Sequence, residues 1–90
     1  MESIYKLILD TKNRRLLYGL EKIELSPGEY YLLFVLSDNQ FHAYSEFEKF
    51  FNSRGALSTQ KHRLCKRILF LKIRTVVKSG YRLDNILYIK

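Results

Sequence analysis

Apolar residues occur at strand spacing near both ends of the chain and at helical spacing in its middle. Residues 4–9, 15–18 and 21–25 are short stretches of branched or alternating apolar side chains. The turn-forming residues 10–13 and then Gly19 separate them. Because short apolar runs between turn signals are typical of strands joined by hairpins, we expect an antiparallel β-meander over residues 1–25.

Two helix starts follow the meander. Ser26 and Glu29 have the spacing of a capping box, and Pro27 suits the first helical position, so we expect a helix that begins here and ends near residue 36. Ser45 and Glu48 repeat the capping-box spacing. This repeat predicts a short second helix over residues 46–52, with three aromatic side chains turned inward, those of Phe47, Phe50 and Phe51.

A third helix is predicted from Ser58 or Thr59 to about Leu71. At 100° per residue, Leu64, Ile68 and Leu71 fall on one face, which is expected to pack against the core. The opposite face contains no acidic residue and is polar apart from Phe70; its polar members are Thr59, His62, Arg63, Lys66 and Arg67. A solvated face normally mixes both signs of charge, so this face indicates contact with an anionic partner.

The last part of the chain returns to strand spacing. Residues 74–77 and 81–83 predict a hairpin whose turn is formed by Lys78, Ser79 and Gly80, and residues 86–89 predict a last strand. The order of elements predicts one α+β domain over residues 1–90, a winged helix-turn-helix. Its expected parts are an N-terminal sheet (1–25), a three-helix core (26–72), and a wing hairpin with a C-terminal strand (73–90).

Charge is distributed unevenly along the chain, whose formal net charge is +7. Residues 1–58 contain seven Lys and Arg against eight Asp and Glu, whereas residues 59–90 contain nine basic residues against one acidic residue, Asp84. The basic excess therefore lies wholly in the last third, which favours a polyanion as the partner of that end.

Several motifs resemble the winged-helix effector domain of OmpR/PhoB-type response regulators. Leu-Ser-Pro-Gly-Glu-Tyr-Tyr-Leu-Leu (25–33) is similar to the start of that family's first helix, and Tyr-Ser-Glu-Phe (44–47) stands where its second helix is capped. Ile-Arg-Thr-Val (73–76) followed by Gly-Tyr-Arg-Leu (80–83) is similar to its closing hairpin. Two positions depart from the pattern: Lys78 replaces the first wing glycine, and Leu69 replaces a recognition-helix arginine.

The resemblance implies a transcriptional regulator that binds double-stranded DNA, with the third helix in the major groove and the wing in the minor groove. It further implies side-by-side binding of two copies to direct repeats, contact with RNA polymerase through the loop 52–57, and a cytoplasmic location with the nucleoid in a bacterial or phage cytosol. The expected contacts come from the third helix (Thr59, His62, Arg63, Lys66 and Arg67) and from the wing and its flank (Lys72, Arg74, Lys78, Ser79 and Arg82). Because Arg63 and Arg67 are four residues apart and carry planar forks, we expect them to read bases.

Other functions find less support in the sequence. Two histidines, one cysteine and scattered carboxylates form no nucleophile–base pair or metal motif, so we expect neither an enzyme nor a bound metal or cofactor. No apolar run is long enough to span a membrane, and no membrane partner is expected. The main alternative is a protein-interaction adaptor or anti-regulator that uses Phe70 and residues 86–89. Structured RNA is a second alternative, although its narrow major groove fits a helix poorly.

Overall fold

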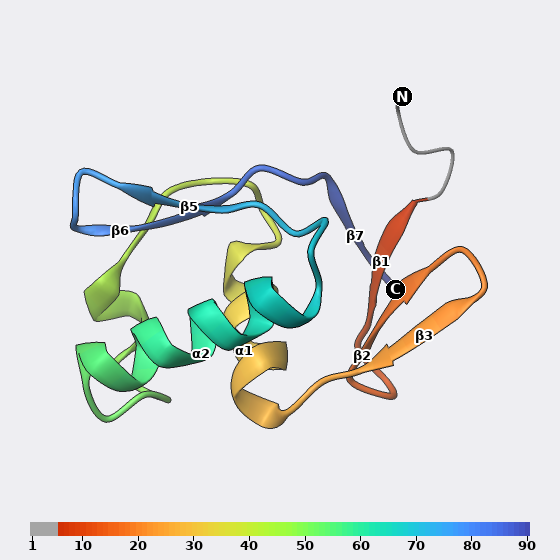
Figure 1. The fold of residues 1–90 in the computed structure, drawn as a ribbon, viewed down its shortest axis with the longest axis horizontal. Coiled ribbons are helices and arrows are strands. Elements are labelled where there is room, and N and C mark those ends of the chain that lie inside the picture. The colour runs from red at the N-terminus through yellow and green to blue at the C-terminus, as the bar shows by residue number, and fades with distance from the viewer. Residues whose placement is uncertain (1–5) are drawn as a thin grey trace.

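The computed structural model describes residues 6–90, and two small β-sheets flank a pair of crossed helices in it (Figure 1). The elements in chain order are β1 (Leu7–Asp10), β2 (Arg15–Tyr18), β3 (Glu21–Glu24), α1 (Pro27–Leu36), β4 (His42–Ala43), the 3-10 helix η1 (Tyr44–Phe47), α2 (Arg54–Arg67), β5 (Ile73–Val76), β6 (Gly80–Leu83) and β7 (Leu87–Ile89).

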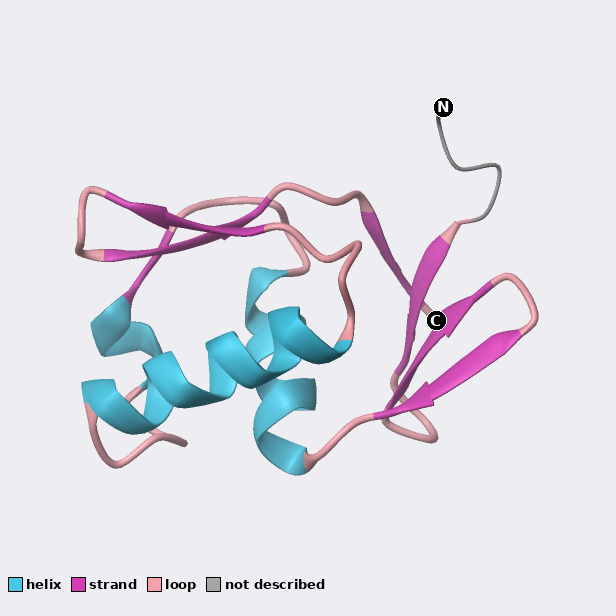
Figure 2. Cartoon of the chain, viewed as in Figure 1, coloured by secondary structure: helices cyan, strands magenta, loops and turns pink. Residues whose placement is uncertain are grey.

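The first sheet has the strand order β3-β2-β1-β7. Its β1–β2–β3 part is the predicted antiparallel meander, which is confirmed for the described residues; residues 4 and 5 of the predicted first strand lie outside them. The C-terminal strand β7 pairs in parallel with β1, and the Lys90 N–H donates to the Leu9 carbonyl at 3.0 Å. The last strand therefore completes the N-terminal sheet and does not extend the wing (Figure 2).

The second sheet consists of the predicted hairpin, β5–β6, and the two-residue strand β4, which the sequence did not predict. Ala43 lies opposite Gly80 in the β4–β6 pair. A Cβ on Gly80 would lie 2.2 Å from the His42 carbonyl oxygen and 2.7 Å from the Phe41 ring. Only glycine therefore lets β4 approach β6 closely enough to pair.

Leucines from both helices and both sheets meet in one core. Leu32, Leu33 and Leu36 of α1 are fully buried, and they pack with Leu64 of α2 and Leu83 of β6. Leu64, Ile68 and Leu71, the predicted inward face of the third helix, are all buried, but only Leu64 lies within α2, and the other two follow its last residue. No helix among the described residues is both long and apolar enough to cross a membrane.

The expected three-helix winged fold is wrong, because the described residues contain two α-helices and a single 3-10 turn. The predicted second helix over 46–52 is replaced by η1, which begins earlier and lasts four residues. The Glu46 carboxylate accepts a hydrogen bond from the Ala43 N–H at 2.8 Å, and this contact fixes a tight turn at Tyr44, whereas the sequence pattern favoured a helix that begins at residue 46 after a Ser45 cap. The α+β class agrees with the structure.

The predicted third helix, from Ser58 or Thr59 to about Leu71, corresponds to α2, which begins and ends about four residues earlier. It begins at Arg54 because Ser53 is the N-cap, and the Ser53 hydroxyl accepts from the Ala56 N–H at 3.0 Å. It ends at Arg67, since Ile68 is extended (φ −118°, ψ 91°). Phe70 leaves the helix and stacks on Tyr18 of β2, with ring centroids 4.5 Å apart.

The hairpin turn lies one residue earlier than predicted. Val77 and Lys78 both have positive φ (50° and 55°), and the Ser79 N–H donates to the Val76 carbonyl at 3.0 Å. Gly80 is the first residue of β6 and not part of the turn. Gly80 allows the close β4–β6 contact, and the turn itself is formed by residues that carry side chains, Val77, Lys78 and Ser79.

His42 joins three segments next to this sheet. Its Nδ1 lies 2.7 Å from Glu46 Oε1 of η1, and its Nε2 lies 2.8 Å from Asp38 Oδ1, just beyond α1. A neutral imidazole carries a single N–H, so only the protonated ring donates both bonds. Burial alone lowers the pKa of His42, but the hydrogen bonds with Glu46 and Asp38 outweigh it and raise that pKa above its usual 6.5.

Gly80→Ala is expected to lower the free energy of unfolding by about 2 kcal/mol or more, because the added Cβ would clash with the His42 carbonyl and push β4 away from β6. Urea unfolding followed by circular dichroism measures this effect. Gly55→Ala is the matched control, since its Cβ would have only the Ser53 hydroxyl nearby, at 3.7 Å, and its stability should be unchanged or slightly higher. Equal losses in both variants would contradict the close β4–β6 approach.

His42→Gln is expected to lower the free energy of unfolding by on the order of 1 kcal/mol below pH about 6.5, and this loss of stability should become smaller as pH rises. A raised folded-state pKa gives stability that is complete below the unfolded pKa and disappears as pH rises through the folded pKa. Urea unfolding of both proteins at pH about 5.5 and about 8.5 tests this. His62→Gln serves as the control, and a pH-independent His42→Gln loss would show that the charged bridge contributes nothing.

Candidate nucleic-acid interface

One side of α2 is packed and the other is open to solvent. Leu57, Leu64 and Ile68 are buried against the core. Four exposed side chains lie opposite them within an arc of about 100° centred near Lys66; they are Thr59, His62, Arg63 and Lys66. We call these four residues the α2 outer face. None of the four forms an ion pair with any residue between 6 and 90.

Arg67 lies at the border of this face and is held by the protein itself. Its guanidinium is 3.3 Å from the carboxylate of Glu29 and donates to the Glu24 carbonyl at 2.5 Å. Glu29 is 4% exposed and also accepts from the Ser26 N–H at 2.8 Å. Arg67 therefore joins the end of α2 to the start of α1 and to β3, and it is a positioning residue for α2.

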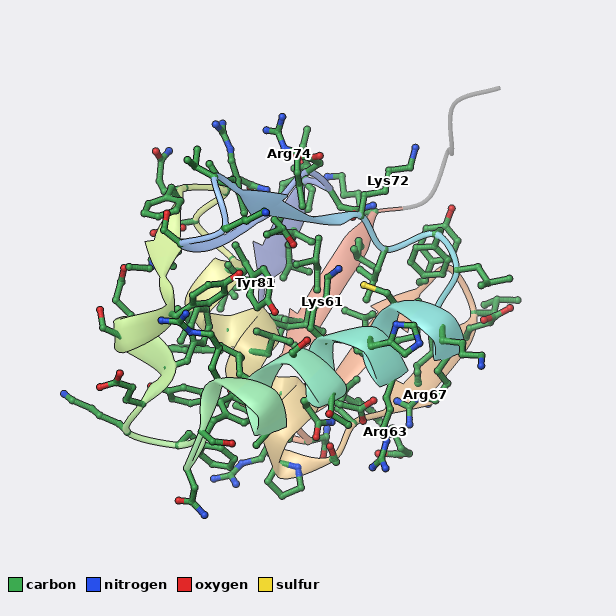
Figure 3. The ribbon with its side chains drawn as sticks, turned by 60° about the vertical axis from the view of Figure 1, so that its left-hand side comes forward. Lys61, Arg63, Arg67, Lys72, Arg74 and Tyr81 are labelled. Carbon is green, nitrogen blue, oxygen red and sulfur yellow. The ribbon has the colours of Figure 1, made fainter. Side chains whose placement is uncertain are left out.

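Arg63 and Arg67 both extend away from the β5–β6 hairpin (Figure 3). Lys61 extends in the other direction, toward the hairpin, and its Nζ lies 5.8 Å from the centre of the Tyr81 ring. The four-residue spacing thus brings the two arginines to one side, as the sequence indicated, but only Arg63 has a free guanidinium. The prediction that Arg67 reads bases is not tested by any of these contacts.

The hairpin carries its basic residues in two places. Lys78 is exposed at the tip of the turn, where Ser79 uses its hydroxyl to donate to the Val76 carbonyl at 3.3 Å. Arg74 and Arg82 lie on the exposed face of the hairpin, and Arg74 points away from α2 (Figure 3). The sequence grouped these residues with the third helix because it could not show which face of the hairpin they occupy.

Lys72 lies in the connection between α2 and β5. Its backbone is fixed on both sides, since its N–H donates to Asn85 Oδ1 at 2.7 Å and its carbonyl accepts from the Asp84 N–H at 2.8 Å. Its side chain is exposed and extends from the same edge of the molecule as Arg74 (Figure 3). Three of the predicted wing and flank residues, Lys72, Arg74 and Arg82, therefore do not form one surface with the α2 outer face.

The predicted loop 52–57 is mostly helical, because α2 begins at Arg54. The Arg54 guanidinium lies 4.8 Å from the centre of the Tyr44 ring, a contact that the sequence did not suggest.

An apolar depression of about 400 Å³ lies between the end of α2 and the first sheet, lined by Tyr18, Ile23, Ile68, Leu69 and Phe70 together with Glu21 and Arg67. Leu69 is 83% exposed at its edge.

Metal chemistry has no candidate site in the part of the chain that the structure describes, where no three His, Cys, Asp or Glu side chains come together as ligands. Cys65, on α2, is a free thiol and partly buried. Comparisons with protein-family models, with curated proteins and with solved structures found no match for this chain.

Arg67→Gln is expected to lower the free energy of unfolding by about 1–3 kcal/mol, because the buried Glu29 carboxylate loses its cation. Arg63→Gln removes the same charge from the same helix without breaking a contact and should change stability by less than about 0.5 kcal/mol. Chemical denaturation of both variants measures the difference. If the two substitutions cost the same, Arg67 does not hold α2 in place.

Proposed function

We propose that this protein binds double-stranded DNA through the α2 outer face and acts as a transcriptional regulator. The observation that carries the proposal is the pair of exposed cations on that face, Arg63 and Lys66, which make no ion pair with a described residue and lie in a segment with nine basic residues and one acidic residue. Such a one-sided surface is favourable beside a polyanion and is poorly explained by solubility alone, which is usually achieved with both signs of charge.

The dimensions of α2 suit a major groove. A helix of 14 residues is about 21 Å long, and B-DNA has a major groove about 12 Å wide that admits one α-helix. The outer face runs from Thr59 to Lys66, so about half of that length, roughly 10 Å, can follow the groove. Helix α1 crosses behind α2 and the first sheet stands to one side of it (Figure 1), and the side chains of the α2 outer face are exposed.

Each residue of the face has a distinct role in this proposal. Arg63 carries the free guanidinium, whose planar fork matches the O6 and N7 acceptors of guanine. Lys66 is a compact cation that contacts phosphates, and Thr59 and His62 donate or accept single hydrogen bonds at the groove edge. Lys78, at the hairpin tip, supplies a further phosphate contact. Arg74 and Arg82 are left out of this interface because they belong to the other side of the hairpin.

The resemblance to OmpR/PhoB-type domains supports the same function from the motifs, independently of charge. Binding of two copies to direct repeats, contact with RNA polymerase through residues 52–57, and a cytoplasmic location with the nucleoid rest on that resemblance alone. These three points are proposals that follow only if the protein binds DNA.

A protein-interaction role is the second candidate, and one observation favours it. Leu69 is 83% exposed at the rim of the 400 Å³ apolar depression near the end of α2, and contiguous exposed apolar surface is a mark of protein-interaction sites. This candidate requires no nucleic acid, so a failure of the experiment below would favour it.

Fluorescence anisotropy with labelled duplexes of mixed sequence tests the DNA proposal. The affinity should fall with salt at a log–log slope of about −0.9 for each phosphate neutralised. Lys66→Gln should weaken binding to all sequences alike and make the slope less steep by about 0.9. Arg63→Gln should weaken the preferred sequence by about tenfold and others less.

Lys22→Gln is the matched control, because Lys22 is an exposed lysine on β3 and does not belong to the α2 outer face. It should leave the affinity within about twofold. Equal effects of Lys22→Gln and Lys66→Gln, or a wild-type affinity that does not respond to salt, would overturn the proposed interface. A competing RNA duplex that displaces the DNA at equal concentration would point to the RNA alternative.

A further inference from the structure

Three side chains form a row across the outward face of the second sheet. Arg74 of β5 lies directly opposite Arg82 of β6. Phe41 precedes β4 by one residue, and continuing the β4–β6 register, in which His42 is opposite Tyr81, places Phe41 opposite Arg82. The three residues line one shallow depression of about 270 Å³ together with Thr75, Val76 and Val77.

The two arginines face each other without enough negative charge to neutralise them. Like charges directly opposite on neighbouring strands destabilise a sheet. Arg74 has a single acidic neighbour, Asp84, at 3.4 Å, and Arg82 makes no ion pair with any described residue. A bound anion between the two guanidinium groups would relieve this repulsion and would accept charge-assisted hydrogen bonds from both.

Phe41 gives the depression an aromatic wall. Its ring packs over Gly80, whose missing side chain makes room for it, and the residue is still 43% exposed. An exposed flat ring beside two arginines is the combination found where unpaired bases stack and their phosphates are held by cations. Bases within a duplex are stacked on each other, so this ring is of use only to an unpaired strand.

The row is separate from the α2 outer face. Ile73, Tyr81 and Leu83 of the same hairpin turn inward and are buried in the core. Arg74 extends from the opposite side, whereas Arg63 extends away from the hairpin altogether (Figure 3). Nothing bound at one of these surfaces needs to touch the other.

We propose that the outward face of the β4–β6–β5 sheet binds single-stranded nucleic acid, with a backbone phosphate between Arg74 and Arg82 and the adjoining base stacked on Phe41. The site takes an unpaired strand because it offers one aromatic platform and one pair of cations, which together match a single nucleotide step. It goes beyond duplex binding by α2 and does not depend on it.

The experiment measures fluorescence anisotropy of a labelled oligothymidylate of about 15 nucleotides with the full chain at low salt. Arg82→Gln and Arg74→Gln should each weaken binding by about tenfold. Phe41→Leu keeps an apolar contact on Gly80 but removes the aromatic face, and it should weaken binding about fivefold or more. Arg82→Lys keeps the charge without the planar fork and should lie between wild type and Arg82→Gln.

Lys22→Gln is the matched control, since it removes an exposed cation of β3 that belongs to neither surface and should leave oligothymidylate binding within about twofold. Thermal melts confirm that each variant is folded. The proposal is overturned if the wild type does not bind the oligonucleotide, or if Lys22→Gln or Lys66→Gln weakens binding as much as Arg82→Gln does. It is also overturned if Arg82→Gln weakens duplex binding instead, which would make this face part of a duplex interface. If Lys66→Gln loses duplex binding and keeps oligonucleotide binding, the two ligands bind at different surfaces, as proposed.

Discussion

The buried carboxylate of Glu29 sets the position of α2 and therefore of everything that α2 presents. It accepts the Ser26 N–H at the start of α1 and faces the Arg67 guanidinium at the end of α2. Arg67 in turn reaches the Glu24 carbonyl at the end of β3. A buried carboxylate is costly without a cation and donors, so these partners must stay together. The contact joins a sheet and two helices at one corner, and the α2 outer face remains exposed.

The β5–β6 hairpin separates two kinds of surface. Its inward side chains enter the core, and Lys61 of α2 reaches under it to the Tyr81 ring. Its outward side chains share a face with Phe41, which follows α1 and not α2. Because successive residues of a strand alternate between faces, a basic strand cannot direct all its charges to one partner. The molecule thus has two basic surfaces with different geometry, a convex helix and a shallow sheet face with an aromatic ring.

The local signals in the sequence were sufficient for the meander, for α1 and for the hairpin, since turn residues and the Ser26–Glu29 capping box act within a few residues. They failed where distant contacts decide. The Glu46 carboxylate forms hydrogen bonds with the His42 ring and the Ala43 N–H, and a single 3-10 turn replaces the expected second helix. For the candidate interface, spacing placed Arg63 and Arg67 together correctly but could not show that Arg67 meets a buried acid brought from α1. Phe41 had no local signal at all, because its neighbours come from β5 and β6.

The parallel pairing of β7 with β1 has a consequence for how the chain acquires its structure. The Thr11 hydroxyl donates to the Lys90 carbonyl across 79 positions of sequence. Contacts of such long range are entropically costly to close and form slowly compared with hairpins. During synthesis, β1 therefore has one open edge until β7 has been made, and this exposed edge is a point where a nascent chain is vulnerable to mispairing with another strand. Pairing with β7 covers this edge of β1, and β7 then becomes the edge strand of the sheet.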